Sequence, residues 1–263
     1  RSPQGASVAK PGTLLRKYKL EPPGLLGEMT TRRELETLLE LCVALESKEA
    51  AATLVQFAGL GLDGGRYTAS QAPHSVREIA QKVIGKFTNT EAKQFILDVA
   101  RGEEKVGRRK EVAGNRAGAI QALGQFEDEV FRPAIESGLT SEATEVRRAA
   151  DQGLGARTNQ QSVRPLIDAV AKETIGSNLM LLVATLEDCM ESAKDGVTAS
   201  ERRLAVEAAI GGLGKTGWRG DMMLVEFLGR FRSAEAVPAL IKVLEWFVDA
   251  DDKIRSGELS TIL

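Results

Sequence analysis

The sequence is poor in the residue types that most often build metal centres and catalytic sites. Its 263 residues include one histidine, His74, and two cysteines, Cys42 and Cys189. Zinc and di-iron sites usually need several His or Cys ligands, and a Ser-His-Asp triad needs a histidine beside a recognisable nucleophile. We therefore expect no metal centre, no cofactor and no catalytic activity of its own.

Other shortages exclude further classes. No apolar run approaches the roughly 20 residues that a membrane-spanning helix needs, and aromatic residues make up only 5% of the chain. A formal net charge of −2 gives no general attraction to nucleic acid or to an anionic membrane. Each cysteine lies in an apolar helical stretch, which predicts buried free thiols. Their low number fits a reducing compartment such as the cytoplasm.

Apolar residues recur at three- and four-residue steps along most of the chain, which is the period of amphipathic helices. No segment shows the two-residue alternation of strands, so an all-α fold is expected. Residues 1–29 form a basic, Pro- and Gly-containing tail, and the first helix is predicted at 31–46. Further helices are predicted at 48–60, 74–87, 90–101, 115–126, 128–139, 143–154, 161–172, 177–192, 200–213, 219–231, 233–248 and 252–263.

An internal repeat connects these helices. A glycine is followed by a proline after nine, ten and nine residues, in the pairs Gly124 and Pro133, Gly155 and Pro165, and Gly229 and Pro238. We expect each glycine to end a helix by adopting a conformation that other residues resist. The proline then stands early in the next helix, where its missing amide costs little.

The repeat carries a family resemblance. Residues Glu145–Gly155 (EVRRAADQGLG) and Ala236–Leu244 (AVPALIKVL) resemble the two helices of a HEAT repeat, in the armadillo-like superfamily. The resemblance extends over 48–263. It implies an α-solenoid domain at 30–263, with about six helix pairs and an N-terminal capping helix. In such a solenoid each pair buries its apolar face against its neighbours.

The C-terminal end departs from the pattern. Asp251–Arg255 has the form of a helix start in this family, but the predicted helix at 252–263 lacks the usual Leu-Gly ending. We therefore expect that the array continues in a longer chain, or that this end pairs with something.

Basic residues gather at 101–116, where Arg108, Arg109, Lys110 and Arg116 contribute to a local excess of positive charge. This segment is predicted to be a loop within a helix pair. It is either a solvated loop or a contact for an acidic partner or a phosphate backbone.

Two tryptophans are the next candidates. Trp218 and Arg219 lie in a glycine-flanked loop, and large amphipathic rings commonly anchor interfaces. Packing between repeats is the competing interpretation for Trp218, and the one we favour. Trp246 stands in an apolar helical run and is expected in the core.

Residues 209–216 (AIGGLGKT) fit a relaxed phosphate-loop pattern. The strict pattern has glycine in place of Ala209, and a phosphate loop follows a buried strand, whereas 202–209 has a helical period. We therefore do not predict a nucleotide site here.

These observations favour a non-catalytic scaffold or adaptor that binds another macromolecule, and a protein in preference to a nucleic acid. Two alternatives stay open. One is a nucleic-acid-binding or base-repair module, supported by the basic loop and tail but opposed by the charge and the scarcity of aromatics. The other is a regulatory subunit of an enzyme, which no particular residue supports. The oligomeric state does not follow from the sequence.

Overall fold

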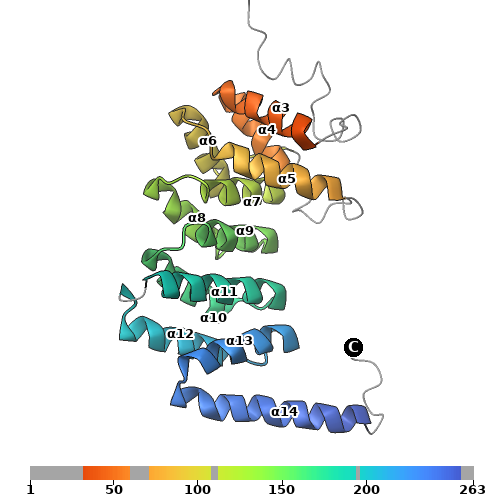
Figure 1. Cartoon of the computed structure of the whole chain (residues 1–263), viewed down its shortest axis with the longest axis vertical. Helices are drawn as coiled ribbons and strands as arrows, with labels where there is room; N and C mark the ends of the chain where they lie inside the picture. Colours follow the sequence, from red (N-terminus) through yellow and green to blue (C-terminus); the bar gives the residue numbers. More distant parts are fainter. Residues whose placement is uncertain (1–31, 60–70, 108–111, 194–195, 256–263) are drawn as a thin grey trace, which may run out of the picture. The chain divides into compact units, whose positions relative to one another are not determined.

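The computed structural model describes residues 32–59, 71–107, 112–193 and 196–255, and every regular element within them is a helix (Figure 1). The all-α prediction is confirmed for these residues. The predicted tail at 1–29 lies outside them. The chain folds into two compact units, Arg1–Arg157 and Thr158–Leu263.

In the first unit the helices follow the predicted order, with boundaries shifted by a few residues. Cap residues explain several of the starts. The Asn89 side chain, for example, accepts hydrogen bonds from the amides of Glu91 and Ala92 at the beginning of α6. The helices are α3 (Arg32–Ala44), α4 (Lys48–Ala58), α5 (Gln71–Ile84), α6 (Thr90–Arg101), α7 (Val112–Leu123), η1 (Glu129–Phe131), α8 (Arg132–Gly138) and α9 (Thr144–Gly155).

In the second unit a capping box opens α12, because the Thr198 and Glu201 side chains each accept a bond from the other's amide. The helices are η2 (Gln160–Ser162), α10 (Val163–Lys172), α11 (Gly176–Ala193), α12 (Ala199–Gly212), α13 (Trp218–Phe231), η4 (Ala234–Ala236) and α14 (Val237–Arg255). Among the described residues, none of the helices has both the length and the apolar character that crossing a bilayer requires.

The final helix corrects one prediction. Separate helices were expected at 233–248 and 252–263, but α14 runs without a break from Val237 to Arg255. The motif at Asp251–Arg255 therefore lies inside α14 and does not start a new helix. Residues 256–263 lie outside the described residues. Nothing between 239 and 255 is Gly or Pro, so no residue there interrupts the backbone hydrogen bonds.

Two of the repeated glycines stand at helix ends as predicted, since Gly124 follows α7 and Gly155 is the last residue of α9, but none of the three has the predicted backbone conformation. Among the described residues, positive φ angles at glycine occur at Gly102, Gly107, Gly214 and Gly217, and none of the glycines of the repeat is among them. A Cβ atom added at Gly124 would lie 2.6 Å from the carbonyl oxygen of Gly153 on α9. Gly124 is therefore required by close packing and not by an unusual backbone conformation.

Helix α7 is the centre of the first unit. Its residues Ala117, Ile120 and Leu123 are fully buried. A Cβ atom at Gly118 would lie 2.5 Å from the backbone nitrogen of Gly59, so α7 and the end of α4 touch through their backbones. Small residues on α7 permit this approach, and larger ones would force the helices apart.

Successive interhelix loops are tied together within each unit. In the first, the Glu46 carboxylate accepts bonds from the amides of Thr88 (3.1 Å) and Asn89 (2.6 Å). Arg157, whose side chain is only 6% exposed, donates to the carbonyl oxygens of Phe126 and Glu127. In the second unit, the Gln160 amide donates to the Gly196 carbonyl oxygen. Within each unit, one interhelix loop is therefore hydrogen-bonded to a later interhelix loop.

Candidate binding surface on helices α13 and α14

The segment that resembles a phosphate loop is the turn between two helices. Helix α12 ends at Gly212, and α13 begins at Trp218. The Gly214 amide donates a 2.9 Å hydrogen bond to the Asp221 carboxylate, so a protein acid already occupies a position where a phosphate oxygen would have to bind. The turn follows a helix, α12, and not the buried strand that precedes a phosphate loop.

The basic segment is described only in part, because Arg108, Arg109 and Lys110 lie outside the described residues. Arg116 is described and lies in α7. Its Nε donates a 2.9 Å hydrogen bond to the carbonyl oxygen of Ala100, near the end of α6. Burial lowers the pKa of its guanidinium below the usual range. Arg116 thus secures the end of a helix in the first unit, whereas Trp218 and Arg219 belong to the second unit.

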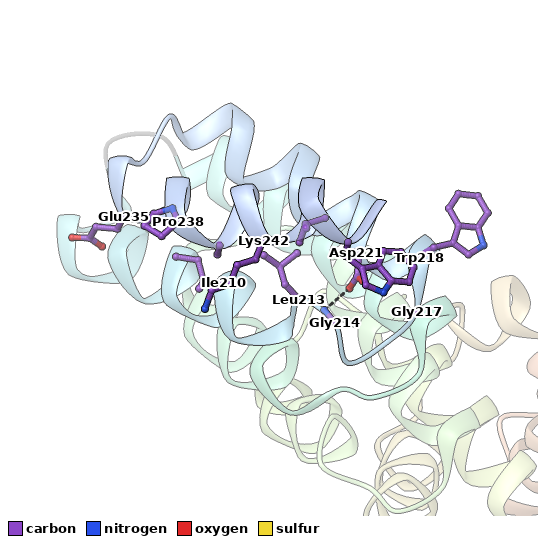
Figure 2. Close-up of a pocket in the computed structure, with 12 residues that line it drawn as sticks. Ile210, Leu213, Gly214, Gly217, Trp218, Asp221, Glu235, Pro238 and Lys242 are labelled. Carbon is purple, nitrogen blue, oxygen red and sulfur yellow. Dashed lines mark hydrogen bonds between the residues drawn. The ribbon is translucent and has the colours of Figure 1, made fainter. Parts of the chain in front are cut away.

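Trp218 and Arg219 lie together at the first turn of α13. The Arg219 guanidinium carbon is 5.6 Å from the centroid of the Trp218 ring, which is cation–π range. The Trp218 side chain points away from its neighbours (Figure 2), and the residue is 58% exposed. The expectation that Trp218 packs between repeats is therefore wrong, because most of the indole faces solvent.

Trp246 is a second correction. It was expected in the core but is 57% exposed. The apolar period of α14 was correctly identified, but the helix has more apolar residues than the rest of the described unit covers.

Four of these extra residues form a row, which we call the outer stripe: Val237, Ile241, Leu244 and Val248. All four are exposed, and Leu244 is the most exposed, at 64%. Their spacing is four, three and four residues, which is the spacing of the apolar seam of a coiled coil. The outer stripe therefore has the form of a surface that packs against another helix.

A groove of about 700 Å³ lies along α14, between this helix and the adjoining parts of α12 and α13. Its walls are mainly apolar, and Figure 2 shows Lys242 in the middle of the group, with Glu235 and Trp218 at opposite ends. The apolar lining comes chiefly from Ile210, Leu213, Pro238, Ala239, Val243 and Trp246. None of the outer-stripe residues lines this groove.

A buried acid elsewhere in the second unit stabilises the start of a helix. Glu173, 5% exposed, accepts hydrogen bonds from the amides of Thr174 and Ile175 before α11. Within the described ranges, no group of three or more His, Cys, Asp or Glu side chains is arranged to hold a metal ion.

Both cysteines are buried free thiols, as predicted, and burial raises the pKa of Cys42.

Sequence reasoning found Trp218 and Arg219 but missed the outer stripe and the groove. Exposed apolar residues in contiguous sets mark interaction sites, so the apolar surface on α13 and α14 is a candidate binding surface. Comparison with protein-family models and with curated proteins gave no match.

Proposed function

We propose that this protein is a non-catalytic scaffold of the HEAT-repeat type that binds a helical segment of another protein on the outer stripe of α14. The single observation that carries the proposal is the row of exposed apolar side chains with coiled-coil spacing, Val237, Ile241, Leu244 and Val248. A surface of this kind is costly to leave in water and gains free energy when a partner covers it.

The loop contacts support the solenoid part of the proposal. A solenoid holds each helix pair to its neighbours only, so a bond between one interpair loop and the next is the expected contact. Glu46 with Thr88 and Asn89 makes such a bond in the first unit, and Gln160 with Gly196 makes one in the second. Gln160 lies between Gly155 and Pro165, which are one of the glycine and proline pairs of the sequence repeat.

The spacing of the outer stripe argues for a helix as the occupant. Residues four, three and four apart form a nearly straight row along one helix, and an opposing helix can place its own side chains between them over the whole length. A strand or an irregular loop would cover only part of the row. Glu245 is exposed one position after Leu244, so a partner helix with Lys or Arg beside its apolar row would suit this surface.

Site-specific photocrosslinking tests the proposal. Benzoylphenylalanine replaces Leu244 in one variant and Leu181 in the control; Leu181 is an exposed leucine of α11 in the same unit. A partner crosslinked only through position 244 is identified by mass spectrometry, and the crosslinked segment is synthesised as a peptide. We expect that peptide to become helical on binding and to bind the unmodified protein.

Charge substitution then decides the outcome. Leu244→Glu should weaken binding of the peptide at least tenfold, while Leu181→Glu should change it by less than about twofold. Equal effects of the two substitutions, or crosslinks from position 244 only to a second copy of the same chain, would contradict the proposal.

A further inference from the structure

The groove beside α14 has the dimensions and lining of a binding site. Its volume of about 700 Å³ lies within the range of ligand pockets, roughly 300–1,000 Å³. Such pockets combine apolar walls with a few polar groups that fix orientation. Here Leu213, Pro238 and Trp246 contribute apolar surface, and the charged groups at the groove are Asp221, Glu235 and Lys242.

These three charges are not equally available to a ligand. Asp221 is buried, and its Oδ1 already accepts the Gly214 amide. Glu235 lies at one end of the groove and its carboxylate points away from the other labelled residues, as Figure 2 shows. Lys242 lies between the ends, facing Ile210 and Leu213, and it forms no ion pair with any described residue. The charge that a ligand would meet inside the groove is therefore positive.

An apolar wall next to an unpaired ammonium is complementary to a ligand that has a bulky apolar group close to a carboxylate. In a peptide, the C-terminal residue combines both on one Cα atom, so it fits a short groove with a single cation. We propose that this groove binds the C-terminal residue of a partner polypeptide, with a large apolar or aromatic side chain against Leu213, Pro238 and Trp246 and the α-carboxylate on Lys242. This site is separate from the outer stripe and does not depend on the proposed function.

Two small probes test the charge requirement directly. N-acetyl-tryptophan has the apolar side chain and the free carboxylate, whereas N-acetyl-tryptophanamide differs only in lacking the negative charge. Ligand-observed NMR with the full chain should give a dissociation constant of about 0.1 to a few mM for the acid, as expected for a ligand of this size. The amide should bind about three- to tenfold more weakly, because an accessible ion pair contributes modestly. A third probe, N-acetyl-Trp-Asp-amide, moves the carboxylate to the next side chain and should bind no better than the amide.

Variants locate the site. Lys242→Gln should abolish the preference for the acid over the amide, while Lys215→Gln, a lysine of the neighbouring turn that does not line the groove, should preserve it. Ala239→Phe should fill the groove and weaken both probes at least tenfold. Ala184→Phe, at an exposed alanine of α11, is the control for adding a ring to the surface.

Several results would overturn the proposal. Equal binding of N-acetyl-tryptophan and its amide would do so. A preference for the acid that persists in Lys242→Gln, or binding of the Trp-Asp probe that is tighter than that of the amide, would also do so. Circular dichroism of the Ala239→Phe variant shows whether it folds, and the Lys242→Gln result remains decisive if it does not. Leu244→Glu should leave binding of N-acetyl-tryptophan unchanged, so loss of helix binding at the outer stripe and loss of groove binding can be told apart.

Discussion

Helices α7 and α14 are both rich in apolar residues, but they use them in opposite ways. In α7, Ile120 and Leu123 are completely buried, and glycine at position 118 allows the backbone of α4 to approach. In α14, Ile241 and Leu244 are 48% and 64% exposed. One helix is covered by its own chain, and the other leaves large side chains uncovered.

This contrast shows that the packing role of a large apolar residue depends on what covers its helix. Where the same chain supplies the cover, as for α7, small residues permit backbone contact and dense packing. Where large branched residues stand in a row on the outside, as in α14, they supply apolar area that the described chain does not bury. Apolar content alone does not separate these two situations.

The largest expected effect compares one leucine from each helix. Leu123→Ala should lower the free energy of unfolding by about 2–5 kcal/mol, because it leaves a cavity among fully buried neighbours. Leu244→Ala should change it by less than about 0.5 kcal/mol, because an exposed side chain loses little burial. Urea denaturation followed by circular dichroism measures both. A similar loss for the two variants would mean that α14 is covered in solution, and a change of oligomeric state would then show by what.

A smaller effect is expected at glycine. Gly118→Ala should cost about 1–3 kcal/mol, because the added Cβ would lie 2.5 Å from the Gly59 nitrogen and backbone must move. Gly211→Ala, in α12, is the matched control, since nothing lies within 4 Å of a Cβ there. It should stabilise the protein by up to about 1 kcal/mol, through higher helix propensity. If both substitutions stabilise the protein, the close contact between α4 and α7 does not limit stability.

The sequence was sufficient to predict the helices, because their signals are local. The predicted helix at 90–101 coincides with α6. Asn89 caps the start of this helix, and Gly102, with a φ of 82°, ends it. The prediction that a new helix begins at 252 was wrong. The acidic pair Asp251 and Asp252 resembles a helix start, but no residue there interrupts α14. A motif that usually starts helices cannot end the preceding one without a Gly, a Pro or a competing cap.

The candidate site was less predictable, because exposure is a long-range property. Trp246 has the same local pattern as a core residue, and only the position of the neighbouring helices leaves it exposed. The role of Gly118 depends on Gly59, which is far away in the sequence and contacts it only in the fold. Trp218 and Arg219 were found because a tryptophan in a glycine-flanked turn is unusual, and such a signal does not need the fold.

The smallest expected effect concerns the hydrogen bonds of the Glu46 carboxylate to Thr88 and Asn89 in the first unit. Glu46 has a positive φ of 45°, a conformation that costs a non-glycine residue roughly 1 kcal/mol. Burial acts to raise the pKa of Glu46, but hydrogen bonds from the Thr88 hydroxyl and from the Thr88 and Asn89 amides outweigh it, so the pKa is lowered. A carboxyl group whose pKa is lower in the folded protein stabilises it above the ordinary glutamate pKa, about 4.3. That stabilisation is lost as the pH falls through the folded-state pKa.

Glu46→Gln should therefore lower the free energy of unfolding at pH 7 by about 1 kcal/mol or less, as expected for an accessible charged group. The difference from the unmodified protein should shrink as the pH is lowered from 5 to 3, because the carboxylate becomes protonated and loses its advantage. Thr88→Val removes only the hydroxyl donor, at 2.7 Å, and should give an intermediate loss at pH 7. Urea titrations at several pH values measure all three proteins. A deficit in Glu46→Gln that stays the same at pH 3 would show that the contact acts through shape and not through charge, and the loops of the first unit would then be held mainly by the packing of the helices they join.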